Sequence, residues 1–368
     1  MLHLFRWQPH RTRRHTSILQ GVSVLNESAN GGVLVADELE TLNKENMQTS
    51  GADAADVGIG EPEFDTAPIQ TPRNVKLAML AAVVFPPLGV LTAMVLLWGG
   101  LFNSTDLILL GTMYVLTGLG ITVGYHRLCT HKAFATRGPI AFFFLAFGTM
   151  AGQGPVIWWC ATHRRHHQYS DKQFDPHSPH AGYEPGLVGF CKGFMHSHIG
   201  WLFEKEQPDY KRYVPDLLED PMIMWLDRMF VPILFAGLLL PAAVSGFITG
   251  TWLGAGLGLL WGGLVRMFML HHSTWSVNSV CHVWGQKEYR SGDESRNNPI
   301  MGILALGEGW HNNHHAFPAS ARHGLKWWQF DLSWIVIRSL QIVGLASKVR
   351  LPSKERMQER RRVNSPVS

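Results

Sequence analysis

Four long apolar stretches limit what this 368-residue chain can fold into. They cover residues 77–97, 107–125, 229–249 and 253–270, and only the last contains a charged residue, Arg266, near its end. A helix of about 20 apolar residues crosses the hydrocarbon core of a bilayer, which is about 30 Å thick. The long side chain of Arg266 can reach towards the interface. We therefore predict an all-α membrane protein with four transmembrane helices.

Composition agrees with this class and excludes others. Charged residues make up 16% of the chain, against about 25% in soluble globular proteins. The chain is therefore not a simple soluble enzyme, and its apolar middle excludes a disordered chain. A net charge of +4 is too small to indicate a nucleic-acid partner. The four Cys residues are scattered, which argues against a disulfide scaffold and fits a reducing compartment.

The two ends differ in composition from the middle. Residues 1–75 are expected to form a disordered acidic and polar tail, because residues 27–72 hold ten acids and one base. Arginines before residue 15 leave an organelle transit peptide as an alternative to a plain tail. Residues 76–345 form the predicted integral-membrane domain. Residues 346–368 form a basic tail with seven Lys or Arg residues, which is either solvated or attracted to anionic lipid.

Charge also predicts how the spans are oriented. The links at 98–106 and 250–252 contain no Lys or Arg, whereas the segments before the first span and after the second and fourth contain many. Basic segments remain on the cytoplasmic side of membranes. We expect two tight hairpins, with both termini and a helical cap, formed from residues 126–228 and 271–368, in the cytoplasm.

Histidine is the unusual residue of this sequence. Nine of the nineteen His lie just beyond the predicted spans, in four motifs. These nine are His126, His131, His163, His166, His167, His282, His311, His314 and His315. Helical positions i, i+3 and i+4 share a face, so each HxxHH motif should project its three imidazoles together.

Nine imidazoles suit two metal ions with four or five ligands each. Imidazole binds zinc, copper, iron and nickel, so residue type leaves the metal open. The other ten His are expected to have no ligand role. No catalytic residue is expected beyond the metal centre itself.

A shared metal site also indicates whether a fifth apolar run, at residues 139–160, crosses the membrane. If this run crossed the membrane, the motif at 163–167 would lie on the opposite side from the motif at 126–131. The run also contains Gly152, Gly154 and Pro155 in its second half. We therefore expect it to be re-entrant or interfacial.

The motifs HRLCTH, HRRHH, NSVCH and GEGWHNNHH closely resemble those of membrane fatty-acyl desaturases of the stearoyl-CoA (delta-9) type. The resemblance covers roughly residues 75–340. It implies an O₂-dependent enzyme with two irons, which introduces a cis double bond into a saturated acyl chain, most simply at carbon 9. It also implies that the nine His are the iron ligands and that Asn278 holds a metal-bound water.

The resemblance implies an acyl tunnel as well. Its kink would be lined by Gln153, Trp159 and Thr274, with Trp275 adjacent. Its closed end would lie at Tyr114 and Gly118 on the second span. Packing of the protein core is the alternative interpretation of all six residues, and Gly118 would then simply allow two helices to approach closely.

Two departures from the animal enzymes leave the acyl carrier open. Their Arg-Asp pair before the second motif is replaced by Ala161 and Thr162, and the loop at 175–201 is longer, as in the bacterial branch. The partner is a fatty-acyl thioester, on CoA or acyl carrier protein, or an acyl lipid of the membrane. No cytochrome b5 motif is found, so a ferredoxin or a cytochrome b5, each with its reductase, is the expected electron donor.

Two other functions remain in competition. A related di-iron enzyme could hydroxylate the chain or act at another position. A metal transporter or storage protein would place its polar ligands near the middle of its spans. Here all nine lie at or beyond the predicted cytoplasmic ends, which argues against transport.

Overall fold

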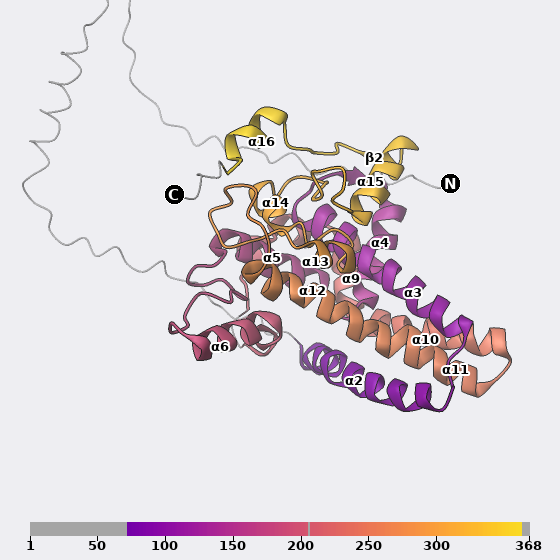
Figure 1. Cartoon of the computed structure of the whole chain (residues 1–368). Coiled ribbons are helices and arrows are strands. Elements are labelled where there is room, and N and C mark those ends of the chain that lie inside the picture. Colours follow the sequence, from indigo (N-terminus) through magenta and orange to yellow (C-terminus); the bar gives the residue numbers. More distant parts are fainter. Residues whose placement is uncertain (1–71, 205–206, 363–368) are drawn as a thin grey trace, which may run out of the picture. The chain divides into compact units, whose positions relative to one another are not determined.

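The computed structural model describes residues 72–204 and 207–362, which fold into helices and one two-stranded sheet (Figure 1). The predicted tail at 1–75 lies almost wholly outside these residues. Four segments are long and apolar enough to cross a membrane: Arg73–Trp98, Ser104–Thr130, Phe230–Thr249 and Trp252–Val283. The predicted all-α membrane fold with four spans is confirmed.

Two of the four segments contain more than one kind of helix. The second joins α3 (Ser104–Leu119) to the π-helix η1 (Gly120–Thr130). The fourth joins α11 (Trp252–Gly258), the π-helix η3 (Leu259–Val265) and α12 (Arg266–Val283). The first is α2 (Arg73–Trp98) and the third is α10 (Phe230–Thr249). The second and fourth segments continue past the predicted ends of their spans, and these continuations carry His126 and His282.

The cap consists of shorter elements gathered at one end of the long helices (Figure 1). In chain order its helices are α4 (Gly138–Met150), α5 (Val156–Tyr169), α6 (Leu187–His198), η2 (Gly200–Phe203), α7 (Tyr210–Tyr213), α8 (Pro215–Leu218), α9 (Pro221–Arg228), α13 (Pro299–Leu304), α14 (His311–Ala316), α15 (Leu332–Ile342) and α16 (Lys354–Arg360). Strands β1 (Ala135–Thr136) and β2 (Ala346–Ser347) pair antiparallel, with Ala135 opposite Ser347.

The fifth apolar run folds as expected for a segment that does not cross the bilayer. Its first part is α4, whose 13 residues span about 20 Å, less than the thickness of the apolar core. The chain then turns, with Gly152 at φ +73° and Gly154 at φ +100°. Glycine adopts these angles without steric cost. The turn allows α5 to begin at Val156 and carry the second histidine motif back to the cap.

The segment predicted as a basic tail is structured as far as Arg362. It forms β2 and α16, and the backbone N–H of Arg362 donates to the carbonyl oxygen of Glu288 over 2.9 Å. The guanidinium of Arg360 donates to the carbonyl oxygen of Ala316, at the end of α14, over 2.7 Å. This basic segment therefore packs against the part of the cap that carries the last histidine motif.

The close crossing of η1 and α4 gives a test of this packing. A Cβ atom added at Gly120 would overlap the backbone nitrogen of Gly148, which cannot move without shifting α4. We expect Gly120→Ala to lower the free energy of unfolding by about 1–3 kcal/mol, measured by denaturation in detergent. The matched control is Gly111→Ala, because nothing lies within 4 Å of a Cβ at that position. Equal stability of the two variants would contradict the packing described here.

Candidate metal centre

The first histidine motif owes its geometry to the π-helix. In η1 the backbone N–H of His131 donates to the carbonyl oxygen of His126, five residues earlier, over 3.1 Å. A π-helix has this i to i+5 pattern, which brings side chains five apart onto one face. In an α-helix the same two positions would diverge. The spacing HxxxxH therefore places both imidazoles on the same side of the second segment.

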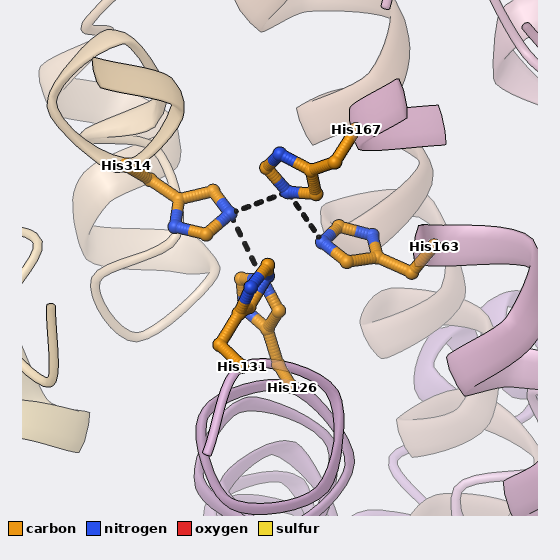
Figure 2. A group of neighbouring side chains, drawn as sticks. All are labelled: His126, His131, His163, His167 and His314. Carbon is orange, nitrogen blue, oxygen red and sulfur yellow. Dashed lines mark hydrogen bonds between the residues drawn. The ribbon is translucent and has the colours of Figure 1, made fainter. Parts of the chain in front are cut away.

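The nine predicted ligands form two clusters. Cluster A contains His126, His131, His163, His167 and His314, and cluster B contains His166, His282, His311 and His315. Within each cluster, one possible ligand atom per residue lies within 4.8 Å of all the others. Figure 2 shows the rings of cluster A turned towards one another from three separate segments of the chain.

Each HxxHH motif serves both clusters, which differs from the prediction that its three imidazoles project together. On α5, His163 and His167 belong to cluster A, and His166 belongs to cluster B. On α14 the pair His311 and His315 belongs to cluster B, and His314 belongs to cluster A. Positions i and i+4 are about 40° apart around an α-helix, and i+3 lies about 60° away on the other side of i. The three side chains share a broad face, but the pair and the single residue point to different centres.

Ring nitrogens face one another at distances suited to a shared ion. In cluster A the Nε2 atoms of His126 and His314 are 3.1 Å apart, and those of His163 and His167 are 3.0 Å apart. In cluster B the Nε2 atoms of His282 and His311 are 3.0 Å apart. Neighbouring nitrogens bound to one ion at about 2.1 Å lie roughly 3 Å apart. His131 Nε2 is buried without a hydrogen-bond partner, as expected of an atom that binds metal.

Four carboxylates fix the rings from behind, and the sequence-based prediction did not include them. They pair with ring Nδ1 atoms at 2.6–2.9 Å: Glu308 with His126, Asp175 with His166, Asp171 with His282 and Asp293 with His315. A carboxylate that accepts from Nδ1 leaves Nε2 as the free ligand atom. Acidic residues near a histidine motif, such as Glu308 in GEGWH, are the signal that could have identified them.

The electrostatics favour neutral imidazoles beside ionised carboxylates. Burial lowers the pKa of His131, His163 and His314 well below the usual value, and neighbouring imidazoles lower it further. Neutral imidazole is the form that binds metal. Burial alone would raise the pKa of Asp175, but the charge and hydrogen bond of His166 outweigh it and hold that pKa below its usual range. At these positions the site combines an ionised acceptor carboxylate with neutral imidazoles.

Two histidines with no predicted ligand role contact the same carboxylates. His323 Nδ1 lies 3.1 Å from Glu308, and its ring centroid is 4.4 Å from that of His314. His177 stacks near His166, with ring centroids 4.2 Å apart, and belongs with it and Asp175 to a third possible metal group. Both are buried. Their proximity to the carboxylates comes from tertiary folding, because neither lies in a recognisable motif.

A cavity of about 590 Å³ reaches cluster A. Its wall includes His163, Asn278 and four of the predicted tunnel residues: Gln153, Trp159, Thr274 and Trp275. The ring of Trp159 stacks on that of His163, with centroids 5.1 Å apart. The amide of Gln153 donates to the hydroxyl of Thr274 over 2.9 Å and joins two walls of the cavity. The cavity therefore brings a bound molecule to a ligand of cluster A.

The other two predicted tunnel residues do not line this cavity. The hydroxyl of Tyr114 donates to the carbonyl oxygen of Leu304 over 2.6 Å. A Cβ at Gly118 would lie 2.7 Å from the side chain of Leu306 and 3.4 Å from that of Leu270. These contacts correspond to the packing interpretation of Gly118, and a tunnel end at these two residues stays a prediction.

The comparisons with known proteins agree with this geometry. A model of the fatty acid desaturase family matches residues 105–339.

The chain belongs to the fatty acid desaturase family.

The desaturase is 42% identical over 279 residues to the hex-5-enoyl-(acyl-carrier protein) acetylenase of Moorena producens, a match that covers 76% of this chain and 87% of the relative. It is 42% identical over 245 residues to the sn-1 stearoyl-lipid 9-desaturase of Anabaena variabilis, with 66% and 82% covered. It is 39% identical over 247 residues to the acyl-CoA C20 Delta5-desaturase of Anemone leveillei, with 66% and 73% covered. The resemblance drawn from the histidine motifs is thereby confirmed.

The carboxylate partners allow the two clusters to be tested separately. We expect Asp171→Asn to weaken metal binding at cluster B about 10–100-fold, because a neutral amide would replace the charged acceptor that orients His282. Glu308→Gln should weaken cluster A through His126. Metal per chain, measured by mass spectrometry after dialysis against a graded chelator, should fall from two ions towards one in each variant. Asp209→Asn, which changes only the cap of α7, is the control. Unchanged metal retention in both test variants would contradict the assigned roles.

Proposed function

We propose that the protein is an O₂-dependent fatty-acyl desaturase that introduces a cis double bond at carbon 9 of a saturated chain, with two irons in clusters A and B. The observation that carries this proposal is the cavity that leads to His163 of cluster A. Two cyanobacterial relatives named sn-1 stearoyl-lipid 9-desaturase support the position of the double bond. The alternative is a related di-iron enzyme that hydroxylates the chain or acts at another position. The related acetylenase and 5-desaturases support this alternative.

The donor set fits iron. All nine candidate ligands are imidazole nitrogens, and imidazole suits iron among other transition metals. Asn278 lies one helical turn before His282 on α12 and also lines the cavity, and this position supports its proposed role of holding a metal-bound water. When bound, two irons would supply an oxidant strong enough to remove hydrogen from an unactivated methylene, with O₂ and external electrons.

The protein's own residues bind and position the chain. Met79, Leu80 and Val83 of α2 form an apolar part of the cavity wall, which also includes Gln153 and Thr274. Trp159, stacked on His163, presents a flat face where the acyl chain passes cluster A. Because His163 lines this cavity, a bound chain would exclude water from that side of cluster A. These residues select which carbons approach the metal.

The acyl carrier is an acyl lipid or a fatty-acyl thioester. Relatives of both kinds exist, including lipid, CoA and acyl-carrier-protein enzymes. In this chain Ala161 and Thr162 stand where the animal enzymes have a charged pair, and Thr162 lines the cavity. Neutral side chains at these two positions favour an acyl lipid of the membrane over CoA, because neither of them pairs with phosphate. The electron donor is external, of the ferredoxin or cytochrome b5 type.

Expression in a desaturase-deficient host tests the function. We expect monounsaturated acyl chains with the double bond at carbon 9, located by mass spectrometry of derivatised lipids. His163→Ala, His282→Ala and His314→Ala should each abolish the product, because each removes a ligand from a buried cluster. His196→Ala, outside both clusters, is the control. Hydroxylated chains would favour the alternative, and full activity of the three ligand variants would refute the metal assignment. Asn278→Ala should retain partial activity, because it acts through water.

Topology is part of the same proposal. The Lys and Arg bias places both termini and the cap in the cytoplasm. Single cysteines at Ser104 and Gly250, in the short links, should react with an impermeant maleimide added to intact cells. A cysteine at Ser291 and the exposed native Cys191, both in the cap, should react only after permeabilisation. Labelling of the cap positions in intact cells would contradict the proposed orientation.

A further inference from the structure

The basic segment from residue 348 to residue 362 has no part in metal or substrate binding. It contains seven Lys or Arg residues and two Glu residues. Lys354, Arg356, Arg361 and Arg362 are exposed on α16 and directly after it. A surface with this excess of positive charge attracts an acidic partner and speeds its encounter.

This segment is hydrogen-bonded to a residue that adjoins a ligand of cluster B. The guanidinium of Arg360 donates to the carbonyl oxygen of Ala316 over 2.7 Å, and Ala316 follows the cluster B ligand His315 in the chain. A second route runs through Tyr289, whose backbone N–H donates to Asn312 Oδ1 over 2.8 Å. Asn312 follows His311, another ligand of cluster B.

A hollow of about 280 Å³ marks the centre of this surface. Its lining residues are Glu288, Tyr289, Lys326, Lys354, Met357, Gln358 and Arg361. Glu288 pairs with Lys326 over 2.9 Å. Among the described residues, Lys354 and Arg361 form no ion pair within the chain. The hollow therefore offers two free cations above the hydrogen-bonded route to cluster B.

The proposed reaction requires an electron donor at some point on the cap. Two C–H bonds of the acyl chain break, one C=C bond forms, and O₂ is reduced to two waters. This reduction takes four electrons, two from the acyl chain and two from outside, together with two protons from solvent. A one-electron carrier must therefore dock twice per turnover.

We propose that α16 and the hollow beside it are the docking surface for an acidic one-electron carrier protein, which delivers electrons to cluster B through Ala316–His315 and Asn312–His311. This inference rests on the proposed desaturase function. An anionic membrane is a less suitable occupant, because α16 lies beyond α14, on the side of the cap away from α2, α10 and α11 (Figure 1). Bases in that place do not meet the bilayer that contains those helices.

Binding of a plant-type ferredoxin to the full-length protein in neutral-lipid nanodiscs tests the surface directly. We expect K354E/R361E to raise the Kd for fluorescently labelled ferredoxin about tenfold and to reduce its dependence on salt. The control pair K172E/K192E makes the same charge change at exposed lysines elsewhere on the cap, and its Kd should match that of the unmodified protein. K354Q/R361Q, which only neutralises the two bases, should give a smaller rise, and it serves as the test pair if the reversed pair does not fold.

An unchanged Kd in K354E/R361E and K354Q/R361Q, or an equal rise in K172E/K192E, would overturn the docking surface. So would a rise that is seen in nanodiscs of anionic lipid but not in neutral ones, which would assign α16 to the membrane. A single-turnover assay separates the two proposals: the protein is reduced without O₂ by dithionite and an uncharged mediator, freed of excess dithionite, and then exposed to O₂. If the unmodified protein makes no double bond in that assay, the proposed function fails, whatever the binding result. If it makes the double bond while the Kd for ferredoxin is unchanged in the α16 variants, only the docking surface fails.

Discussion

Hydrogen bonds that imidazoles donate to carboxylates hold the metal centre in place, and the loops of the cap are arranged around them. Asp171 accepts from His282 on α12 over 2.7 Å and from the backbone N–H of Glu294 over 2.8 Å. It therefore ties the end of α5 to the last long helix and to the loop that carries Asp293. Buried carboxylates without such partners would destabilise the fold. The need to pair each buried carboxylate therefore restricts how the loops of the cap can pack.

The buried arginines between the cap and the spans are likewise paired with acceptors. Arg127 pairs with Glu308 over 3.1 Å and with Asp331 over 3.0 Å, and so holds the carboxylate that orients His126. Arg266 instead donates to backbone carbonyl oxygens, those of Gly262 in η3, Met150 in α4 and Gly237 in α10. It does not reach towards the interface, as its position in the sequence suggested. It satisfies backbone groups where a π-helix and a helix end leave carbonyls free.

The spans, the histidine motifs and the family were predictable because each depends on a local pattern. Runs of apolar residues have a length set by the bilayer, and the spacing of HxxHH is short enough to interpret on one helix. The division of each motif between two clusters was not predictable, because it depends on where α5 and α14 lie relative to each other. Neither was the π-helical form of η1, without which His126 and His131 would not converge. The contacts of His323 with Glu308 and of His177 with Asp175 were not predictable for the same reason, since tertiary folding alone creates them.

The two clusters differ in their surroundings, and this difference suggests a division of labour. Cluster A contributes His163 to the wall of the large cavity, whereas all four members of cluster B are buried. On the opposite side, cluster B is joined through Ala316 and Asn312 to the basic surface of α16. If the proposed function and docking surface are both correct, the acyl chain approaches from the cavity and electrons approach from the outer face of the cap. A donor protein would then not compete with the substrate for access to the centre.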